Sequence, residues 1–100
     1  MIYSSKENKL IKEIKKLQEK KYRDKENKFL IEGIHLVKEA IKSNLVEYII
    51  VEETSNFDYD KKIVVTESIM KYLSSMESKS DIMAVCRKKG GAVKENKIKT

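Results

Sequence analysis

Apolar residues recur at helical spacing in three segments of the chain. Within each segment they return every three or four positions, which places them on one face of an α-helix. The three sets are Leu10, Ile11, Ile14 and Leu17, then Ile34, Val37, Ala40 and Ile41, and finally Ile69, Met70, Leu73 and Met76. The pattern predicts a first helix over about residues 5–20, a second that ends near residue 43, and a third that ends before residue 77.

Polar residues at the expected helix ends support these limits. Ser4 and Glu7 stand three positions apart and fit a capping box before the first helix. Glu32 stands at the start of the second helix, where a carboxylate suits the helix dipole. Thr66 is a suitable N-cap for the third helix.

Four short runs rich in aliphatic residues lie between the helices. Runs of this kind, bounded by polar residues, are typical of buried strands. They cover residues 29–31, 46–51, 62–65 and 82–86. Together with the helices they give the order α-β-α-β-β-α-β. This alternation predicts an α/β fold, a three-layer α/β/α sandwich with a small four-stranded sheet.

The connecting segments are polar. Residues 20–28 are predicted to form a basic turn, and residues 52–60 an acidic loop whose Phe57 and Tyr59 can pack against the core. After residue 87 the lysines and glycines break regular structure, and no core pattern follows. We therefore expect one domain over residues 1–87, and a basic tail or linker over residues 88–100.

Positive and negative charges occupy different parts of the chain, whose net charge is +6. Residues 1–28 carry 10 Lys/Arg and 5 Asp/Glu, residues 29–83 carry 6 and 10, and residues 84–100 carry 6 and 1. If the fold brings the two basic ends together, they form one positive face. Such a face suits a polyanion such as nucleic acid, or an anionic membrane surface. A domain that is merely basic and soluble would have the same composition.

Residues suited to catalysis or metal binding are sparse. His35 and Cys86 each stand alone, and a metal site needs more ligands. We expect His35 to be exposed and Cys86 to be buried. The chain has 3 glycines, too few for a loop that cradles phosphate. The sequence thus predicts no catalytic residues, no metal and no cofactor in this chain.

The remaining chemistry-bearing side chains fit a solvated surface. Glu52, Glu53, Asp58 and Asp60 are expected to lie in a solvated acidic loop. The chain has no apolar run of about 18 residues that could span a membrane, and its first residues have no apolar stretch typical of a secretory signal. One unpaired cysteine fits a reducing compartment. These features predict a cytoplasmic protein with no membrane contact.

Basic residues around one tyrosine are the strongest candidates for binding. Lysine and arginine neutralise phosphates, and an aromatic ring can stack on an unpaired base. Two alternatives stay open: a Tyr22 ring that packs on the domain's own surface, and an Arg23 that pairs with Glu32 inside the fold. The candidate RNA-binding residues are Lys20, Lys21, Tyr22, Arg23, Lys25, Arg87 and Lys88.

The same region carries a family resemblance. Residues 20–25 (KKYRDK) followed by residues 29–33 (FLIEG) resemble the N-terminal substrate-binding domain of SpoU-type (TrmH-like) RNA 2′-O-ribose methyltransferases. Residues 82–85 (IMAV) resemble the last strand of that domain. The sequence departs from the family at residues 79–81, which read KSD where a Pro-Gln-Gly type turn is common.

The resemblance implies both a fold and a role. The fold would be the α/β/α sandwich of kink-turn-binding ribosomal proteins, and the ligand a structured ribosomal or transfer RNA. In the family this domain precedes a knotted SPOUT domain that binds S-adenosylmethionine and transfers the methyl group. Motifs of that catalytic domain have no counterpart in this sequence, so we expect either a fragment cut before it or an isolated domain. The isolated domain is expected to be a monomer, and the full-length protein a dimer.

Three hypotheses follow. The leading one is an RNA-binding accessory domain of a methyltransferase, and the second is a stand-alone kink-turn-binding ribosomal-type protein. The third is a protein-interaction module whose acidic middle docks on the catalytic domain; it predicts that reversing Glu52 and Glu53 changes assembly without affecting RNA binding.

Overall fold

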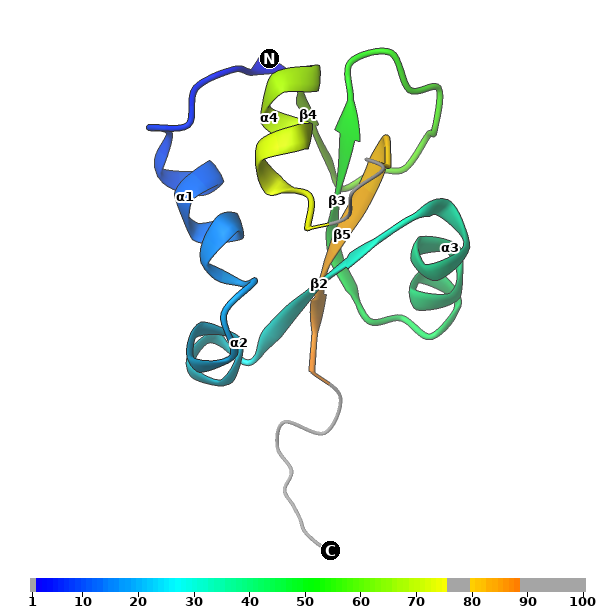
Figure 1. The fold of residues 1–100 in the computed structure, drawn as a ribbon. Coiled ribbons are helices and arrows are strands. Elements are labelled where there is room, and N and C mark those ends of the chain that lie inside the picture. Colours follow the sequence, from blue (N-terminus) through cyan, green and yellow to red (C-terminus); the bar gives the residue numbers. More distant parts are fainter. Residues whose placement is uncertain (1, 76–79, 89–100) are drawn as a thin grey trace, which may run out of the picture.

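The computed structural model describes residues 2–75 and 80–88 (Figure 1). Its strands and helices alternate along the chain, so the predicted α/β class is confirmed. The strands are β1 (Ile2–Tyr3), β2 (Lys28–Glu32), β3 (Val46–Glu52), β4 (Lys62–Val65) and β5 (Ile82–Arg87). The helices are α1 (Lys9–Lys16), α2 (Lys20–Glu26), α3 (Ile34–Lys42) and α4 (Glu67–Leu73).

β3 lies at the centre of the sheet, whose order is β1-β4-β3-β5-β2. Strands β1, β4 and β3 run parallel, and β5 runs antiparallel to both β3 and β2. The register pairs Lys28 with Arg87 and Val46 with Cys86. The start of β2, the start of β3 and the end of β5 therefore lie at the same end of the sheet.

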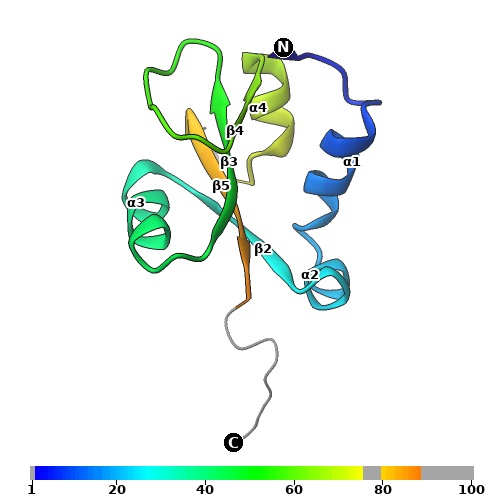
Figure 2. The same cartoon turned by 180° about the vertical axis from the view of Figure 1, so that it is seen from behind.

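Helices cover both faces of the sheet, as the predicted three layers require (Figures 1 and 2). Helices α1, α2 and α4 lie on one side and α3 lies on the other. Alternate residues of β3 face opposite layers, because successive side chains of a strand point to opposite faces. Ile50 packs with α1 and α4, whereas Ile49 and Val51 pack with α3.

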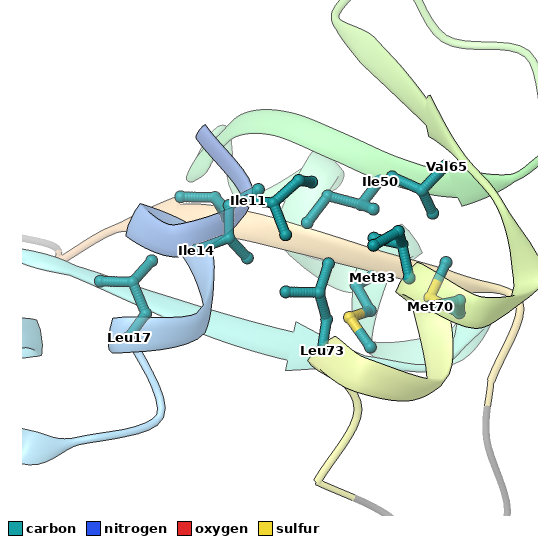
Figure 3. Packing of buried hydrophobic residues seen from close by; sticks show 10 residues of the cluster. Ile11, Ile14, Leu17, Ile50, Val65, Met70, Leu73 and Met83 are labelled. Carbon is teal, nitrogen blue, oxygen red and sulfur yellow. The ribbon is translucent and has the colours of Figure 1, made fainter. Parts of the chain in front are cut away.

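The larger core lies between α1, α4 and the sheet (Figure 3). Ile11 and Ile14 of α1 and Leu73 of α4 point toward Ile50 and Met83 of the sheet, and each of these side chains is at most 1% exposed. Full burial of an aliphatic side chain contributes about 1.5–3 kcal/mol relative to leaving it exposed. This core therefore holds α1 in place, and α2 follows directly from it.

The predicted limits of the first helix were wrong at both ends. Asn8 caps it: the Asn8 side-chain oxygen accepts hydrogen bonds from the backbone N–H of Leu10 (2.9 Å) and of Ile11 (3.3 Å). The backbone N–H of Leu17 bonds the carbonyl of Ile14 in a tighter i→i−3 turn, which ends the helix. The Ser4–Glu7 capping box does not form, because the residues that it would cap lie before the helix.

The spacing of apolar residues did not reveal two of the elements. The two-residue strand β1 pairs with β4 at the edge of the sheet, so the sheet has five strands within the described residues and not four. Residues 20–26 form helix α2 where a turn was predicted. The helix has no buried residue, and it ends at Asn27, which adopts the left-handed conformation with φ of 59°. Helices without an apolar face carry no periodic signal.

Glu32 is the last residue of β2, so its predicted place at the start of the second helix was wrong. Gly33 separates it from α3 with φ of 102°, a conformation that favours glycine. The Glu32 carboxylate accepts hydrogen bonds from Ser74 Oγ (2.7 Å), Ser75 N–H (2.8 Å) and Ser75 Oγ (2.9 Å). It thereby ties the end of β2 to the segment after α4.

The acidic loop is only partly as predicted. Phe57 and Tyr59 do pack against the core beside α3, and Glu53 is exposed. Glu52 is 7% exposed and belongs to β3, so its predicted place in a solvated loop was wrong. Its carboxylate accepts a hydrogen bond from Thr54 Oγ1 at 3.1 Å.

The other single-residue predictions have mixed outcomes. His35 is exposed and Cys86 is fully buried, as expected. Thr66 caps α4 through the backbone N–H of Ile69 at 3.2 Å. The inward position predicted for Met76 lies outside the described residues. Within the described parts of the chain, no helix is long and apolar enough to cross a membrane.

Candidate nucleic-acid interface

The candidate residues from the two ends of the chain meet at one end of the sheet (Figure 1). Arg87 of β5 stands opposite Lys28 of β2, and the backbone N–H of Lys88 donates to the carbonyl of Asn27 at 3.0 Å. Helix α2 immediately precedes β2 at this place. We call this region, formed by residues 20–28 with Arg87 and Lys88, the basic end.

Asp24 organises part of the basic end. Its carboxylate accepts hydrogen bonds from Lys20 Nζ at 2.8 Å and from Lys88 Nζ at 2.5 Å, so it links the first turn of α2 to the residue after β5. The bonds from Lys20 and then Lys88 lower the pKa of Asp24 from 3.8 to about 2. Two of the candidate cations are therefore partly neutralised within the domain.

Arg23 faces the protein more than the solvent. It is half-buried, and its Nη1 donates to the backbone carbonyl of Leu17 at 3.0 Å, across the junction of α1 and α2. Glu32 is at the other end of β2 and is bonded to the serines after α4. The suggested Arg23–Glu32 pair is therefore wrong. The idea that Arg23 has a structural contact is right, although its partner is a carbonyl.

The remaining candidate residues differ in their exposure to solvent. Lys20, Lys21 and Lys25 are exposed along α2. Arg87 is also exposed, and its Nη2 donates to the carbonyl of Asn44 at 3.2 Å, which directs the guanidinium toward the loop before β3. Lys88 is half-buried against Asp24. The exposed charge of the basic end thus comes mainly from α2 and Arg87.

Tyr22 is half-buried and borders a hollow. The ammonium groups of Lys16 and Lys21 lie 5.3 Å and 5.0 Å from the centroid of its ring, within the range of cation–π attraction. The hollow has a volume of about 200 Å³ and lies between α1, α2 and the sheet. Tyr22 therefore packs partly on the domain's own surface and still borders open space.

Sequence reasoning missed several residues of this region. Lys28 stands at the rim of the hollow and pairs with Glu47 at 2.7 Å. Tyr48 of β3 also lines the hollow, and burial is the main cause that raises its pKa to about 12. No local motif marks Tyr48, because only the packing of the helices on the sheet brings it to the same hollow as Tyr22. Lys28 did have a signal, since it is the last residue of the basic segment 20–28.

A second tyrosine with two lysines lies elsewhere on the helical face. Lys6 Nζ and Lys15 Nζ are 5.0 Å and 4.7 Å from the centroid of the Tyr72 ring on α4. Lys15 Nζ also donates to the backbone carbonyl of Tyr72 at 2.7 Å. Here the lysine ties α1 to α4, so proximity of lysine and tyrosine does not by itself mark a binding site.

The part of the chain that the structure describes offers no metal-binding cluster, and its one cysteine is buried. No three His, Cys, Asp or Glu side chains there are placed to hold a metal ion. Burial raises the pKa of the Cys86 thiol to about 11, so it stays protonated at neutral pH and is a poor nucleophile.

Comparison with known proteins shows the family of this chain. Residues 8–84 match the family model described as the MRM3-like substrate binding domain. The chain belongs to that family. The match includes α1, α2 and β2 of this MRM3-like domain, and it stops before Arg87. The resemblance to the substrate-binding domain of SpoU-type methyltransferases is thereby confirmed.

Three relatives illustrate the match. The 23S rRNA (guanosine(2553)-2′-O)-methyltransferase RlmP of Bacillus subtilis (strain 168) is 38% identical over 88 residues, covering 82% of this chain and 36% of RlmP. A solved RNA 2′-O ribose methyltransferase matches with a TM-score of 0.80 and 26% identity, over 97% of this chain and 41% of that one. The SpoU methyltransferase AviRb of Streptomyces viridochromogenes has a TM-score of 0.70 at 14% identity, over 81% and 36%, and shows the fold alone. The MRM3-like domain therefore spans about two fifths or less of these relatives.

Proposed function

We propose that this MRM3-like domain binds structured RNA on behalf of an rRNA or tRNA 2′-O-ribose methyltransferase. The observation that carries the proposal is the basic end, where the first and last basic segments of the chain meet across the Lys28–Arg87 register. Cations fixed by a sheet contact phosphates in a set geometry, and such contacts position a protein on its nucleic acid. The names of the relatives support RNA as the partner.

The contacting residues are proposed from their exposure. Lys21 and Lys25 have no ion pair within the described residues and can bind phosphate directly. Lys20 and Lys88 must first exchange Asp24 for a phosphate. Arg23 keeps α2 against α1 and so acts as a positioning residue.

We assign cofactor binding and methyl transfer to a separate catalytic domain. S-adenosylmethionine is expected in a SPOUT catalytic domain joined through the basic residues 88–100. Gly33 is the single glycine among the described residues, and it opens a helix instead of forming a glycine-rich loop. We further propose a cytoplasmic protein that is monomeric as this domain and dimeric at full length, with the catalytic domain as its intramolecular partner.

The test is an RNA titration of the 100-residue chain at two salt concentrations. Each phosphate that the protein contacts releases its bound counterions. Each such contact therefore makes the slope of log K against log salt more negative by about 0.7–0.9. Lys21→Ala should weaken binding and reduce that slope by about one contact. Lys38→Ala, an exposed lysine of α3 on the opposite face, is the matched control and should leave both unchanged. An affinity that is independent of salt, or equal effects of the two variants, would contradict the proposal.

A further inference from the structure

A hollow of about 200 Å³ lies beside the basic end, between α1, α2 and the sheet. Leu17 and Val85, which are 5% and 1% exposed, form its deep part. Tyr22 and Tyr48 add aromatic surface from α2 and β3. Pockets for drug-sized molecules measure about 300–1,000 Å³, so this smaller space suits a single planar ring system.

The rim of the hollow carries both signs of charge. Lys16, Lys25 and Lys28 supply ammonium groups, and Glu13 and Glu26 supply carboxylates. Both carboxylates are exposed, and neither forms an ion pair within the described residues. A phosphate inside the hollow would face these two carboxylates as well as the lysines. A neutral planar group that has both hydrogen-bond acceptors and amino donors would find a partner for each.

We propose that this hollow binds one unpaired RNA base that carries an exocyclic amino group. The apolar depth and the Tyr22 ring take the face of the base, since base–aromatic stacking is favourable for every base. A carboxylate of Glu13 or Glu26 accepts from the amino group, in the way that Glu and Asp accept from cytosine N4. Adenine, cytosine and guanine meet this requirement, and uracil lacks the amino group.

The lysines and the second tyrosine complete the fit. A base that stacks on Tyr22 displaces the ammonium of Lys16 or Lys21 from the ring, and the freed cation can bind the phosphate of the same nucleotide. The Tyr48 hydroxyl, whose pKa lies at about 12, keeps its proton at neutral pH and can donate to a ring nitrogen or carbonyl.

The cluster at Tyr72 offers an internal comparison. It has the same aromatic ring with two lysines, but the hollow near it is lined by the exposed side chains of Lys6, Glu67, Ser68 and Lys71. It therefore lacks the buried apolar residues that line the hollow beside Tyr22. The proposal predicts base binding at Tyr22 and none at Tyr72.

The inference rests on the proposed RNA binding but is tested with free mononucleotides. The ¹⁵N-labelled 100-residue chain is titrated with AMP, CMP, GMP and UMP, and with ribose 5-phosphate as a probe that has no base. Backbone resonances of Glu13, Tyr22 and Tyr48 should shift with AMP, CMP and GMP, more weakly with UMP, and not with ribose 5-phosphate. Equal shifts with ribose 5-phosphate would mark a phosphate site and overturn the proposal, and so would the absence of any base-dependent shift.

Variants separate the two parts of the site. Tyr22→Leu keeps apolar bulk but removes the stacking ring, and it should weaken mononucleotide binding about fivefold or more. Tyr72→Leu is the matched control and should bind like the unmodified chain. Glu13→Gln combined with Glu26→Gln should bring the affinity for CMP down to that for UMP. Binding that is unchanged in Tyr22→Leu, or a preference for CMP that survives the double variant, overturns the proposal.

The outcomes also separate this inference from the proposed function. Salt-dependent RNA binding that depends on Lys21, without base-dependent shifts at the hollow, leaves the proposed function standing and removes the base site. Base-dependent shifts without binding of any longer RNA support the hollow and contradict the proposed function.

Discussion

Asp24 holds two of the lysines at the basic end, and so it limits the free positive charge that this region presents. Its carboxylate bonds both Lys20 and Lys88, and it is itself 50% exposed. An RNA phosphate that approaches these lysines competes with an anion already in place. Exposed ion pairs are weak because water screens them, so the competition is modest and reversible.

Replacing Asp24→Asn should therefore strengthen RNA binding. The amide keeps the size of the side chain but removes one negative charge next to Lys20 and Lys88. Because these ion pairs are exposed to solvent, we expect a modest gain in affinity, of up to about fivefold. Asp58→Asn, in the exposed acidic loop, is the matched control for net charge. A filter-binding titration compares the two, and an equal gain in both would show that only net charge matters.

The same carboxylate should have an unusual titration. NMR should give Asp24 a pKa of about 2, well below its ordinary 3.8. Because the folded-state pKa is lowered, the stabilisation is complete above about pH 4 and is lost as the pH falls toward 2. Lys20→Ala should raise this pKa more than Lys88→Ala does, since the bond from Lys20 is the larger cause. A pKa that stays near 2 in both variants would contradict the assignment.

At the scale of elements, apolar spacing was sufficient wherever an element buries one face. Helix α3 and strands β3 to β5 lie close to where the sequence placed them, because their apolar residues fill the two cores. Helix α2 buries no residue, and it is supported by the Lys20–Asp24 pair and by the left-handed Asn27. Such local polar support leaves no hydrophobic period, and the basic run therefore suggested a turn.

Substitutions before α1 test whether Asn8 or Ser4 is the N-cap of this helix. Asn8→Ala removes the side-chain oxygen that bonds two backbone N–H groups, and loss of an N-cap costs about 0.5–2 kcal/mol. Ser4→Ala, the cap suggested by spacing alone, should leave the free energy of unfolding nearly unchanged. Urea denaturation of both variants measures the difference. Equal destabilisation would mean that the helix begins earlier than residue 9.

At the scale of the whole molecule, the sheet separates two kinds of polar chemistry. Lys28 stands at the start of β2 and Glu32 at its end, a separation of about 13 Å at 3.3 Å per residue. The first belongs to the basic end, and the second is bonded to Ser74 and Ser75. The sequence revealed the lysines but not this separation, because the partners of Glu32 lie more than 40 positions away.

This separation predicts that a substitution at one end of β2 changes the stability of the domain, whereas a substitution at the other end changes its affinity for RNA. Glu32→Gln replaces a charged acceptor of three hydrogen bonds and should lower the free energy of unfolding by about 1–2 kcal/mol, the low range for partly exposed bonds to a charged group. It should leave RNA affinity unchanged at temperatures where the variant is folded.

Lys28→Ala should have the opposite effects. It loses one surface ion pair with Glu47, worth about 0–1 kcal/mol, so stability changes little. It should weaken RNA binding and reduce its salt dependence by about one phosphate contact. Chemical denaturation and RNA titration of both variants provide the four measurements. If Glu32→Gln weakens RNA binding as strongly as Lys28→Ala does, the RNA contacts the Glu32 end of the sheet, and the basic end is not the principal interface.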